Sequence, residues 1–90
     1  MDLNFSIDAQ KYLDNIPQKH CSQIARKIIS LQRNPYPKDY RQLLGYKDYF
    51  RVTIGEYRVV YKIVDNVIGI VLIGERNDGR IYQDLRKKLS

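Results

Sequence analysis

The sequence predicts an α+β fold: an antiparallel sheet, made of a short N-terminal strand and a three-strand meander, with an N-terminal helical hairpin packed on one face and a short C-terminal helix. Apolar residues recur at helical spacing across residues 8–32, which indicates amphipathic helices. Two runs of alternating apolar and polar residues flank a Gly-Glu pair at 55–56, as is typical of a β-hairpin. An Asp-Asn pair at 65–66 marks a second turn, and an apolar run follows it at residues 67–73.

The N-terminal half is expected to hold one strand and two helices. Apolar and polar residues alternate over residues 2–7, which predicts a short strand, and Asp8 is a suitable cap for the helix that follows. Pro17 ends that helix and is suited to open the next one. The apolar stripe of the second helix covers residues 18–32, and an Asn-Pro pair at 34–35 ends it.

The remaining connections differ in length. Residues 34–47 are expected to run over the surface, with the Leu-Leu-Gly segment at 43–45 closing the connection against the core. Residues 74–80 are predicted to be a polar loop that contains two glycines. Apolar residues at positions 81, 85 and 89 then indicate a short helix. This helix is expected near the second face of the sheet or beyond its end.

The hairpin turn at 55–56 predicts which residues share a face of the sheet, because directly opposed residues lie on the same side. One face carries Phe50, Val52, Ile54, Tyr57, Val59, Tyr61 and Ile63. The other face carries Tyr49, Arg51, Thr53, Arg58, Val60, Lys62 and Val64. The first set is predicted to face the core. The second set gathers three cations, and since like charges on one face repel, a polyanionic ligand is a reason to gather them.

Composition and charge narrow the class of protein. Ninety residues suit one domain, and a hydrophobic content of 43% argues against disorder. A net charge of +6 and a pI of about 9.6 favour a nucleic-acid partner first and an acidic protein second. We expect a cytoplasmic protein with no membrane attachment, because no apolar run approaches a spanning length and the N-terminus lacks signal-peptide form. The single Cys21 agrees with a reducing compartment, and with His20 it is expected to be structural.

The chain resembles the RelE/ParE toxin superfamily in element order and in two segments, LLGYKDYFRVTIGEYRVVYKIVD and IGERNDGRIYQDL. The resemblance covers nearly the whole chain and implies a single RelE-like toxin domain over residues 1–90. In that family a partner antitoxin neutralises the toxin. RelE-type members cut messenger RNA in the ribosomal A site, whereas ParE-type members poison DNA gyrase.

The resemblance also implies roles for individual residues. Arg58 matches the central phosphate-binding arginine, and Arg76 matches the arginine that stabilises the transition state or leaving group. Tyr82 matches the tyrosine near the attacking 2′-hydroxyl. Arg51 lies where RelE-type toxins carry a basic residue. Thr53 departs from the pattern, since a second basic residue is usual there, and the general base is therefore open.

Other basic residues are candidates to compensate for Thr53 by binding RNA phosphates: Lys47, Lys62 and Arg80. Short loops place Arg76, Arg80 and Tyr82 just past the third strand of the meander. Strict alternation from the turn at 65–66, however, puts Arg76 on the core side, so a bulge or turn near Gly74 is needed to redirect it. Solvent-exposed strand arginines and a packing role for Tyr82 are the structural alternatives.

The chemistry of RNA cleavage fits arginines and a tyrosine. Attack by the 2′-hydroxyl needs a base, cations for the phosphorane charge and an acid for the leaving oxygen. The second half of the chain contains no histidine, so these residues must serve, and no metal or other cofactor is expected. The expected partners are an acidic, RelB-like antitoxin and the ribosome with its mRNA. A ParE-like gyrase inhibitor and a basic adaptor for ribosomal RNA are the alternative functions.

Overall fold

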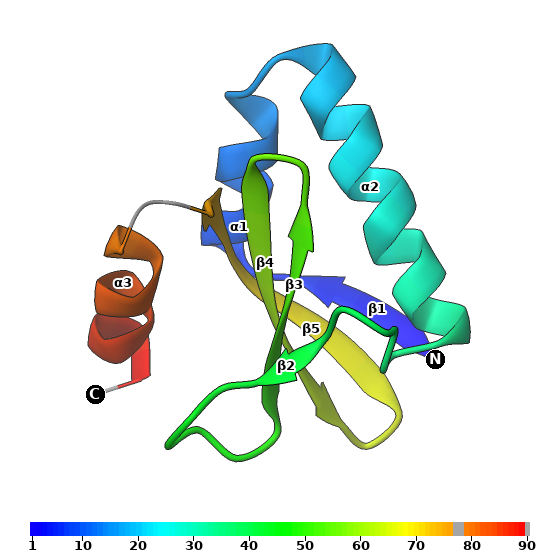
Figure 1. Ribbon diagram of the computed structural model, residues 1–90, viewed down its shortest axis with the longest axis vertical. Helices are drawn as coiled ribbons and strands as arrows, with labels where there is room; N and C mark the ends of the chain where they lie inside the picture. Colours follow the sequence, from blue (N-terminus) through cyan, green and yellow to red (C-terminus); the bar gives the residue numbers. More distant parts are fainter. Residues whose placement is uncertain (77–78, 90) are drawn as a thin grey trace.

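A five-stranded sheet lies between a pair of helices and a single helix. The structure is a computed structural model that describes residues 1–76 and 79–89. The elements in chain order are β1 (Asp2–Phe5), α1 (Ile7–Asp14), α2 (Gln18–Arg33), β2 (Arg41–Gln42), β3 (Tyr49–Ile54), β4 (Tyr57–Val64), β5 (Val67–Glu75) and α3 (Arg80–Leu89). The strand order is β1-β5-β4-β3-β2. Figure 1 shows α1 and α2 on one side of the sheet and α3 on the other.

The predicted α+β class and the predicted hairpin register are confirmed. In the β3–β4 pair, Ile54 is opposite Tyr57 and Arg51 is opposite Val60. The turn between them uses Gly55 at φ +55°, a left-handed conformation that glycine adopts without strain. Asp65 and Asn66 also have positive φ, at 51° and 64°, as the two central residues of a type I′ turn do.

The first face of the sheet packs against α1 and α2, as predicted. Ala9 of α1 and Ile24, Ile28 and Leu31 of α2 are fully or almost fully buried. They join one cluster with the inward residues of β3 and β4, among which Tyr61 is fully buried. The Tyr61 hydroxyl donates to the carbonyl of Pro35 at 2.6 Å. The buried phenol therefore has the hydrogen-bond partner that burial requires.

The second face is covered by α3 over part of its area. Ile81 and Leu85 of α3 are buried in a smaller cluster with Val60 and Leu72 of the sheet and Leu43 of the connection. The C-terminal half of α3 is also tied to α1, since Lys88 Nζ lies 3.0 Å from Asp8 Oδ2. The last helix is thus placed on the second face, the first of the two positions expected for it.

Several local expectations are corrected at the N-terminus. Strand β1 spans only residues 2–5 and pairs in parallel with β5, so the sheet is mixed rather than wholly antiparallel. The cap of α1 is Ser6 and not Asp8, because Ser6 Oγ accepts from Ala9 N at 3.0 Å. Ser6 Oγ also donates to the carbonyl of Val71 at 2.6 Å. A tertiary contact therefore favours Ser6 over a residue with similar capping propensity.

The connection after α2 also differs from the expectation. It contains a short strand, β2, which pairs Arg41 with Arg51 at the edge of the sheet. Of the Leu-Leu-Gly segment, Leu43 is buried, but Leu44 is 98% exposed and Gly45 is exposed at φ +82°. Only one of the three residues therefore closes the connection against the core.

A β-bulge in β5 changes which face its last residues occupy. Val60 is opposite Leu72 and Tyr61 is opposite Ile70, so Val71 is the additional residue. Strand β5 also continues to Glu75, where a loop was expected from residue 74. An extra residue reverses the alternation of side chains beyond it, and residues 72–76 therefore face opposite to the prediction from simple alternation.

Candidate anion-binding site

Two guanidinium groups meet one phenol on the second face of the sheet. Arg58 Nη1 donates to the Tyr82 hydroxyl oxygen at 2.7 Å. Arg51 Nη1 donates to the same oxygen at 3.1 Å. The Arg58 Cζ atom also lies 5.7 Å from the centroid of the Tyr82 ring, within cation–π range. Two cations from neighbouring strands therefore converge on a single oxygen atom.

The positions of these groups follow from the register and from α3. Arg51 and Arg58 are diagonal neighbours across the β3–β4 pair, since Arg58 is opposite Thr53. Tyr82 is the third residue of α3. It directly follows Ile81, which is buried and anchors the helix on the sheet. The side chains of Arg51, Arg58 and Tyr82 are all half-buried, so they are shielded in part from water while remaining open to a ligand.

Arg58 carries an unsatisfied hydrogen-bond donor. Its Nε atom is buried and has no hydrogen-bond acceptor among the described residues. A buried donor without a partner costs about 1–3 kcal/mol. Packing two like-charged arginines side by side adds repulsion. The arrangement is therefore unfavourable for folding on its own, and an anionic ligand would offset the repulsion between the two arginines.

Arg76 directly follows β5, which ends at Glu75. Its backbone N–H donates to the carbonyl of Glu56 at 2.8 Å, which continues the β4–β5 ladder by one pair. Because Gly74 is opposite Arg58 and Glu75 is opposite Tyr57, alternation gives Arg76 a register position on the Arg58 face. The expected redirection thus exists, but its cause is the bulge at Val71 and not a bulge at Gly74. The Arg76 side chain is exposed.

The three auxiliary lysine and arginine candidates lie in different places. Lys62 extends along Gly69, where a Cβ atom would come 3.3 Å from Lys62 Cγ, and it lines a separate cavity with Tyr49 and Lys88. Lys47 is exposed on the loop before β3. None of the hydrogen bonds found among the described residues joins Lys62 or Lys47 to Tyr82.

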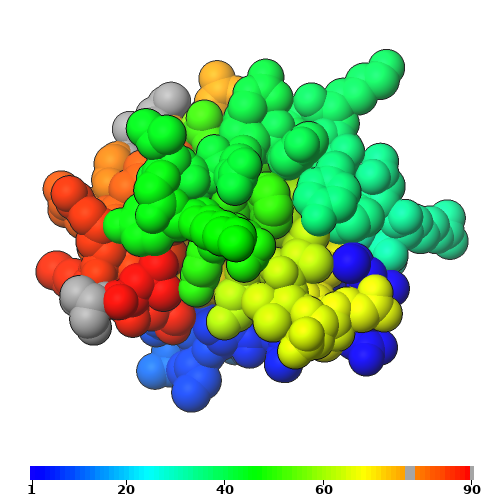
Figure 2. Space-filling model, turned by 90° about the horizontal axis from the view of Figure 1, so that it is seen from below, coloured from blue at the N-terminus to red at the C-terminus, as the bar shows by residue number. Residues whose placement is uncertain are grey.

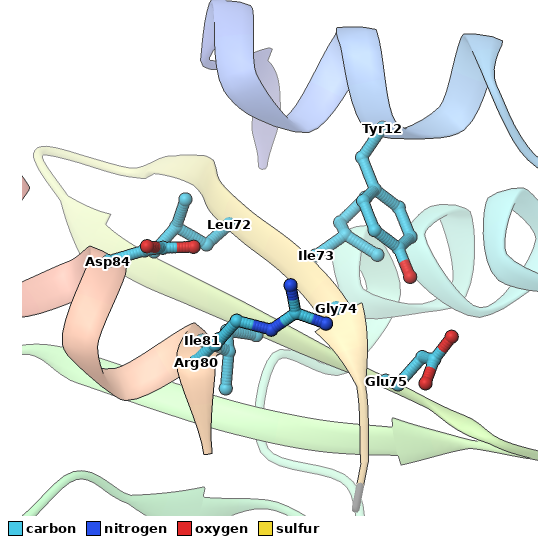
Figure 3. Close-up of a pocket in the computed structure, with 8 residues that line it drawn as sticks. All are labelled: Tyr12, Leu72, Ile73, Gly74, Glu75, Arg80, Ile81 and Asp84. Atoms are coloured by element: carbon cyan, nitrogen blue, oxygen red, sulfur yellow. The ribbon is translucent and has the colours of Figure 1, made fainter. Parts of the chain in front are cut away.

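Arg80 belongs to another hollow, at the free edge of β5. Strand β1 pairs only with residues 67–70, so the edge beyond them is open between α1 and α3. Figure 3 shows Arg80 and Asp84 from α3 and Tyr12 from α1 around this part of β5. The cavity there has a volume of about 240 Å³. Arg80 therefore lines a different cavity from the one that Arg51 and Tyr82 share.

The site offers cations and a phenol rather than metal ligands. Within residues 1–76 and 79–89, no three histidine, cysteine, aspartate or glutamate side chains gather as a metal site requires. His20 instead shares a hydrogen bond of 2.6 Å with the Tyr57 hydroxyl. None of the described helices has the length and apolar character needed to cross a membrane. The chemistry that the arrangement can perform is the binding of an oxyanion.

The connection between α2 and β3 forms one wall of the site, which the sequence did not predict. Leu43 is buried under α3, and Gln42, Leu44 and Tyr46 line a cavity of about 290 Å³ together with Arg51 and Tyr82. Figure 2 shows this connection, in green, beside the orange and red of α3. The glycine after the two leucines was the available signal, since it marks a turn that separates their side chains.

Comparison with known proteins places the chain in a family. Residues 3–79 match the family model described as the ParE toxin of the type II toxin–antitoxin system parDE. This chain belongs to the RelE/ParE toxin superfamily. A Methanocaldococcus jannaschii protein that is named RelE1, and is provisionally assigned as a toxin, is 34% identical in an alignment of 71 residues that covers 73% of this chain and 79% of that relative. The chain is accordingly a RelE-like toxin of a toxin–antitoxin system.

Solved RelE structures share the fold of this RelE/ParE member. The RelE chain in the archaeal RelE–RelB complex from Pyrococcus horikoshii superposes with a TM-score of 0.76 at 26% identity, covering 87% of this chain and 97% of that one. The isolated Escherichia coli RelE toxin superposes with a TM-score of 0.74 at 20% identity, covering 99% and 98% of the two chains. At that lower identity the likeness concerns the fold alone.

Proposed function

We propose that this toxin is a RelE-type, ribosome-dependent mRNA endonuclease that cuts in the A site without a metal. The observation that carries the proposal is the convergence of Arg51 and Arg58 on the Tyr82 hydroxyl oxygen, at 3.1 and 2.7 Å. N–H groups that already donate to one oxygen are oriented to donate to a phosphate oxygen beside it. Family membership supports the same function.

The proposed reaction is attack of a ribose 2′-hydroxyl on the adjacent phosphorus. A new oxygen–phosphorus bond forms, the bond from phosphorus to the 5′-oxygen of the next nucleotide breaks, and one proton moves in total from the 2′-hydroxyl to that 5′-oxygen. Arg51 and Arg58 hold the non-bridging oxygens, whose negative charge grows in the transition state. Tyr82 adjoins the 2′-hydroxyl, and Arg76 acts at the leaving oxygen. The products are a 2′,3′-cyclic phosphate and a 5′-hydroxyl.

The proposal includes an acidic, RelB-like antitoxin as partner and the cytoplasm as location. Solved complexes of RelE with RelB from Pyrococcus horikoshii and from Escherichia coli support an antitoxin partner. The net charge of +6 on this chain favours a negatively charged one. Such a partner is expected to cover the face that carries Arg51 and Arg58, which would inhibit the toxin by excluding RNA.

The test is to map transcript ends after induced expression. We expect wild-type protein to produce cuts inside codons, and Tyr82→Phe to reduce them strongly, because the variant keeps the ring and loses the hydroxyl. Tyr36→Phe is a matched control, since Tyr36 is a half-exposed tyrosine that packs on Tyr40. Arg76→Ala should also reduce cutting. Undiminished cutting by folded Tyr82→Phe and Arg76→Ala proteins would reject the assigned roles.

A gyrase inhibitor of the ParE type is the second candidate, because the matching family model is that of ParE toxins. Such a protein would arrest growth without cutting RNA. The same mapping experiment separates the two functions. Absence of new transcript ends, together with gyrase-dependent DNA damage, would replace the nuclease assignment by the ParE one.

A further inference from the structure

The connection before β3 holds an apolar side chain in a fixed, exposed position beside the arginines. Leu44 is 98% exposed, and a single exposed leucine is not unusual by itself. Its backbone, however, is held by hydrogen bonds on both sides: Leu43 N donates to the carbonyl of Tyr49 at 2.9 Å, and Tyr46 N donates to the carbonyl of Leu43 at 3.2 Å. With Gly45 at φ +82° between them, the loop presents Leu44 in one direction.

Leu44 and Tyr46 share a cavity with the anion-binding groups. The cavity of about 290 Å³ is lined by the apolar and aromatic side chains of Leu44 and Tyr46 together with Gln42, Arg51 and Tyr82. The Tyr46 ring packs against the edge of Tyr49, with centroids 6.3 Å apart and planes at 67°. This contact holds the ring of a residue that also lines the cavity.

A nucleotide matches this combination of surfaces. Its phosphate is an anion, and its base has a flat face that stacks on aromatic and apolar side chains. Its base edge also carries hydrogen-bond donors and acceptors. The Gln42 amide has both kinds of group, and it is exposed at the cavity. An inorganic anion would make no use of Leu44 or Tyr46, and an apolar ligand would make no use of Arg51.

We propose that Leu44 and Tyr46 hold the nucleobase next to the phosphate bound by Arg51, and that Gln42 contacts the edge of this base. The inference rests on the proposed nuclease function and extends it, because it assigns base selection to the connection rather than to the strands. Leu44, Tyr46 and Gln42 are positioning and specificity-determining residues, and they take no part in proton transfer.

The test measures binding, so that it does not depend on cleavage. The probes are an RNA codon with a 2′-O-methyl group at the scissile position, free and in programmed ribosomes, and versions in which one base at a time is removed. We expect removal of one particular base to weaken binding by wild-type protein by about 5- to 150-fold, the range of one stacked base. Leu44→Ala and Tyr46→Ala should bind the intact and abasic probes almost equally.

Controls separate this inference from the proposed function. Ile29→Ala removes another exposed apolar side chain, on α2, and should keep the wild-type dependence on the base. Gln42→Ala should retain stacking but bind probes with different bases at that position with similar affinity. The inference is overturned if no abasic probe binds more weakly, if Leu44→Ala retains the full base dependence, or if wild-type protein binds neither form of the RNA. Base-dependent binding without any cutting would instead reject the nuclease function and retain the base site.

Discussion

The two faces of the sheet differ in what their side chains do. The face toward α1 and α2 is closed by aliphatic and aromatic residues, and its fully buried phenol, that of Tyr61, donates to a backbone carbonyl. The face toward α3 has a smaller apolar cluster, beside which two arginines meet Tyr82 and one buried N–H has no acceptor among the described residues. One face is thus built for stability, whereas the other carries unfavourable electrostatics, as the proposed anion-binding function would require.

The largest effect on stability is expected for a substitution in the core between the sheet and the helices α1 and α2. Ile28 of α2 is almost completely buried, and Ile28→Ala should lower the free energy of unfolding by about 2–5 kcal/mol. Its neighbour Ile29 is 56% exposed, so Ile29→Ala should change this quantity by less than about 0.5 kcal/mol. Urea unfolding measures both. A similar loss from the two variants would contradict the assignment of stability to this face.

The next effect should appear in activity rather than stability. Arg58→Ala should lower the rate of RNA cleavage by about 10²–10³-fold, as removal of one oxyanion donor does in other enzymes. Its free energy of unfolding should not fall by a comparable amount, because the variant also removes an unsatisfied buried donor. Arg26→Ala, on the exposed side of α2, makes the same change in net charge and should cleave normally. Equal losses in these two variants would mean that only total charge matters.

A smaller effect should depend on pH. Burial, and then the nearby Asp39 carboxylate, raise the pKa of the Tyr61 phenol above its ordinary value of about 10. The unfolded chain therefore loses this proton first as pH rises. The contribution of Tyr61 to stability should be constant below pH 10 and decrease above it, by about 1.4 kcal/mol per pH unit until the folded phenol ionises.

Urea unfolding of wild-type protein and Tyr61→Phe at pH 8 and pH 11 measures this effect. At pH 8 the wild-type protein should be more stable, because its hydroxyl donates to the carbonyl of Pro35. At pH 11 that advantage should shrink or reverse. A constant difference between the two proteins would show that the phenol has a similar pKa in the folded and unfolded chain.

The smallest effect is expected for the ion pair between α1 and α3, which lie on opposite faces of the sheet. Asp8 of α1 pairs with Lys88 of α3 at 3.0 Å, with side-chain exposures of 58% and 35%. An ion pair this exposed contributes about 0–1 kcal/mol. Asp8→Asn should therefore lower the free energy of unfolding by less than 1 kcal/mol at low salt, and the difference should fade in 1 M salt. A large, salt-independent loss would indicate that α3 depends on this pair for its position.

Local signals made much of this fold and of its site predictable. The glycine at position 55 and the alternation around it set the register of β3 and β4, and the register alone places Arg51 and Arg58 on one face. Helical spacing of Ile81 and Leu85 likewise predicts which side of α3 meets the sheet, and Tyr82 follows from it. These features depend on residues close together in sequence, where turn geometry and periodicity act directly.

Features that depend on distant contacts were not predictable in this way. Residues 67–73 are apolar on both faces, so no polar residue marks the bulge at Val71. The choice of Ser6 over Asp8 as cap depends on a hydrogen bond to Val71, 65 residues away. The parallel pairing of β1 with β5 is likewise a long-range contact. The cavity wall at Leu44 needed the burial of Leu43 under α3, which only the assembled structure reveals.

With the bulge at Val71, the number of residues between the turn at 65–66 and Arg76 determines on which face of the sheet Arg76 lies. Deleting one residue there would return Arg76 to the side of α1 and α2, whereas a change of two residues would leave it on the same face as Arg58. Length variation in this hairpin among functional homologues should therefore occur in even steps. An insertion or deletion of an odd number of residues should be found only together with a second one that makes the total change even.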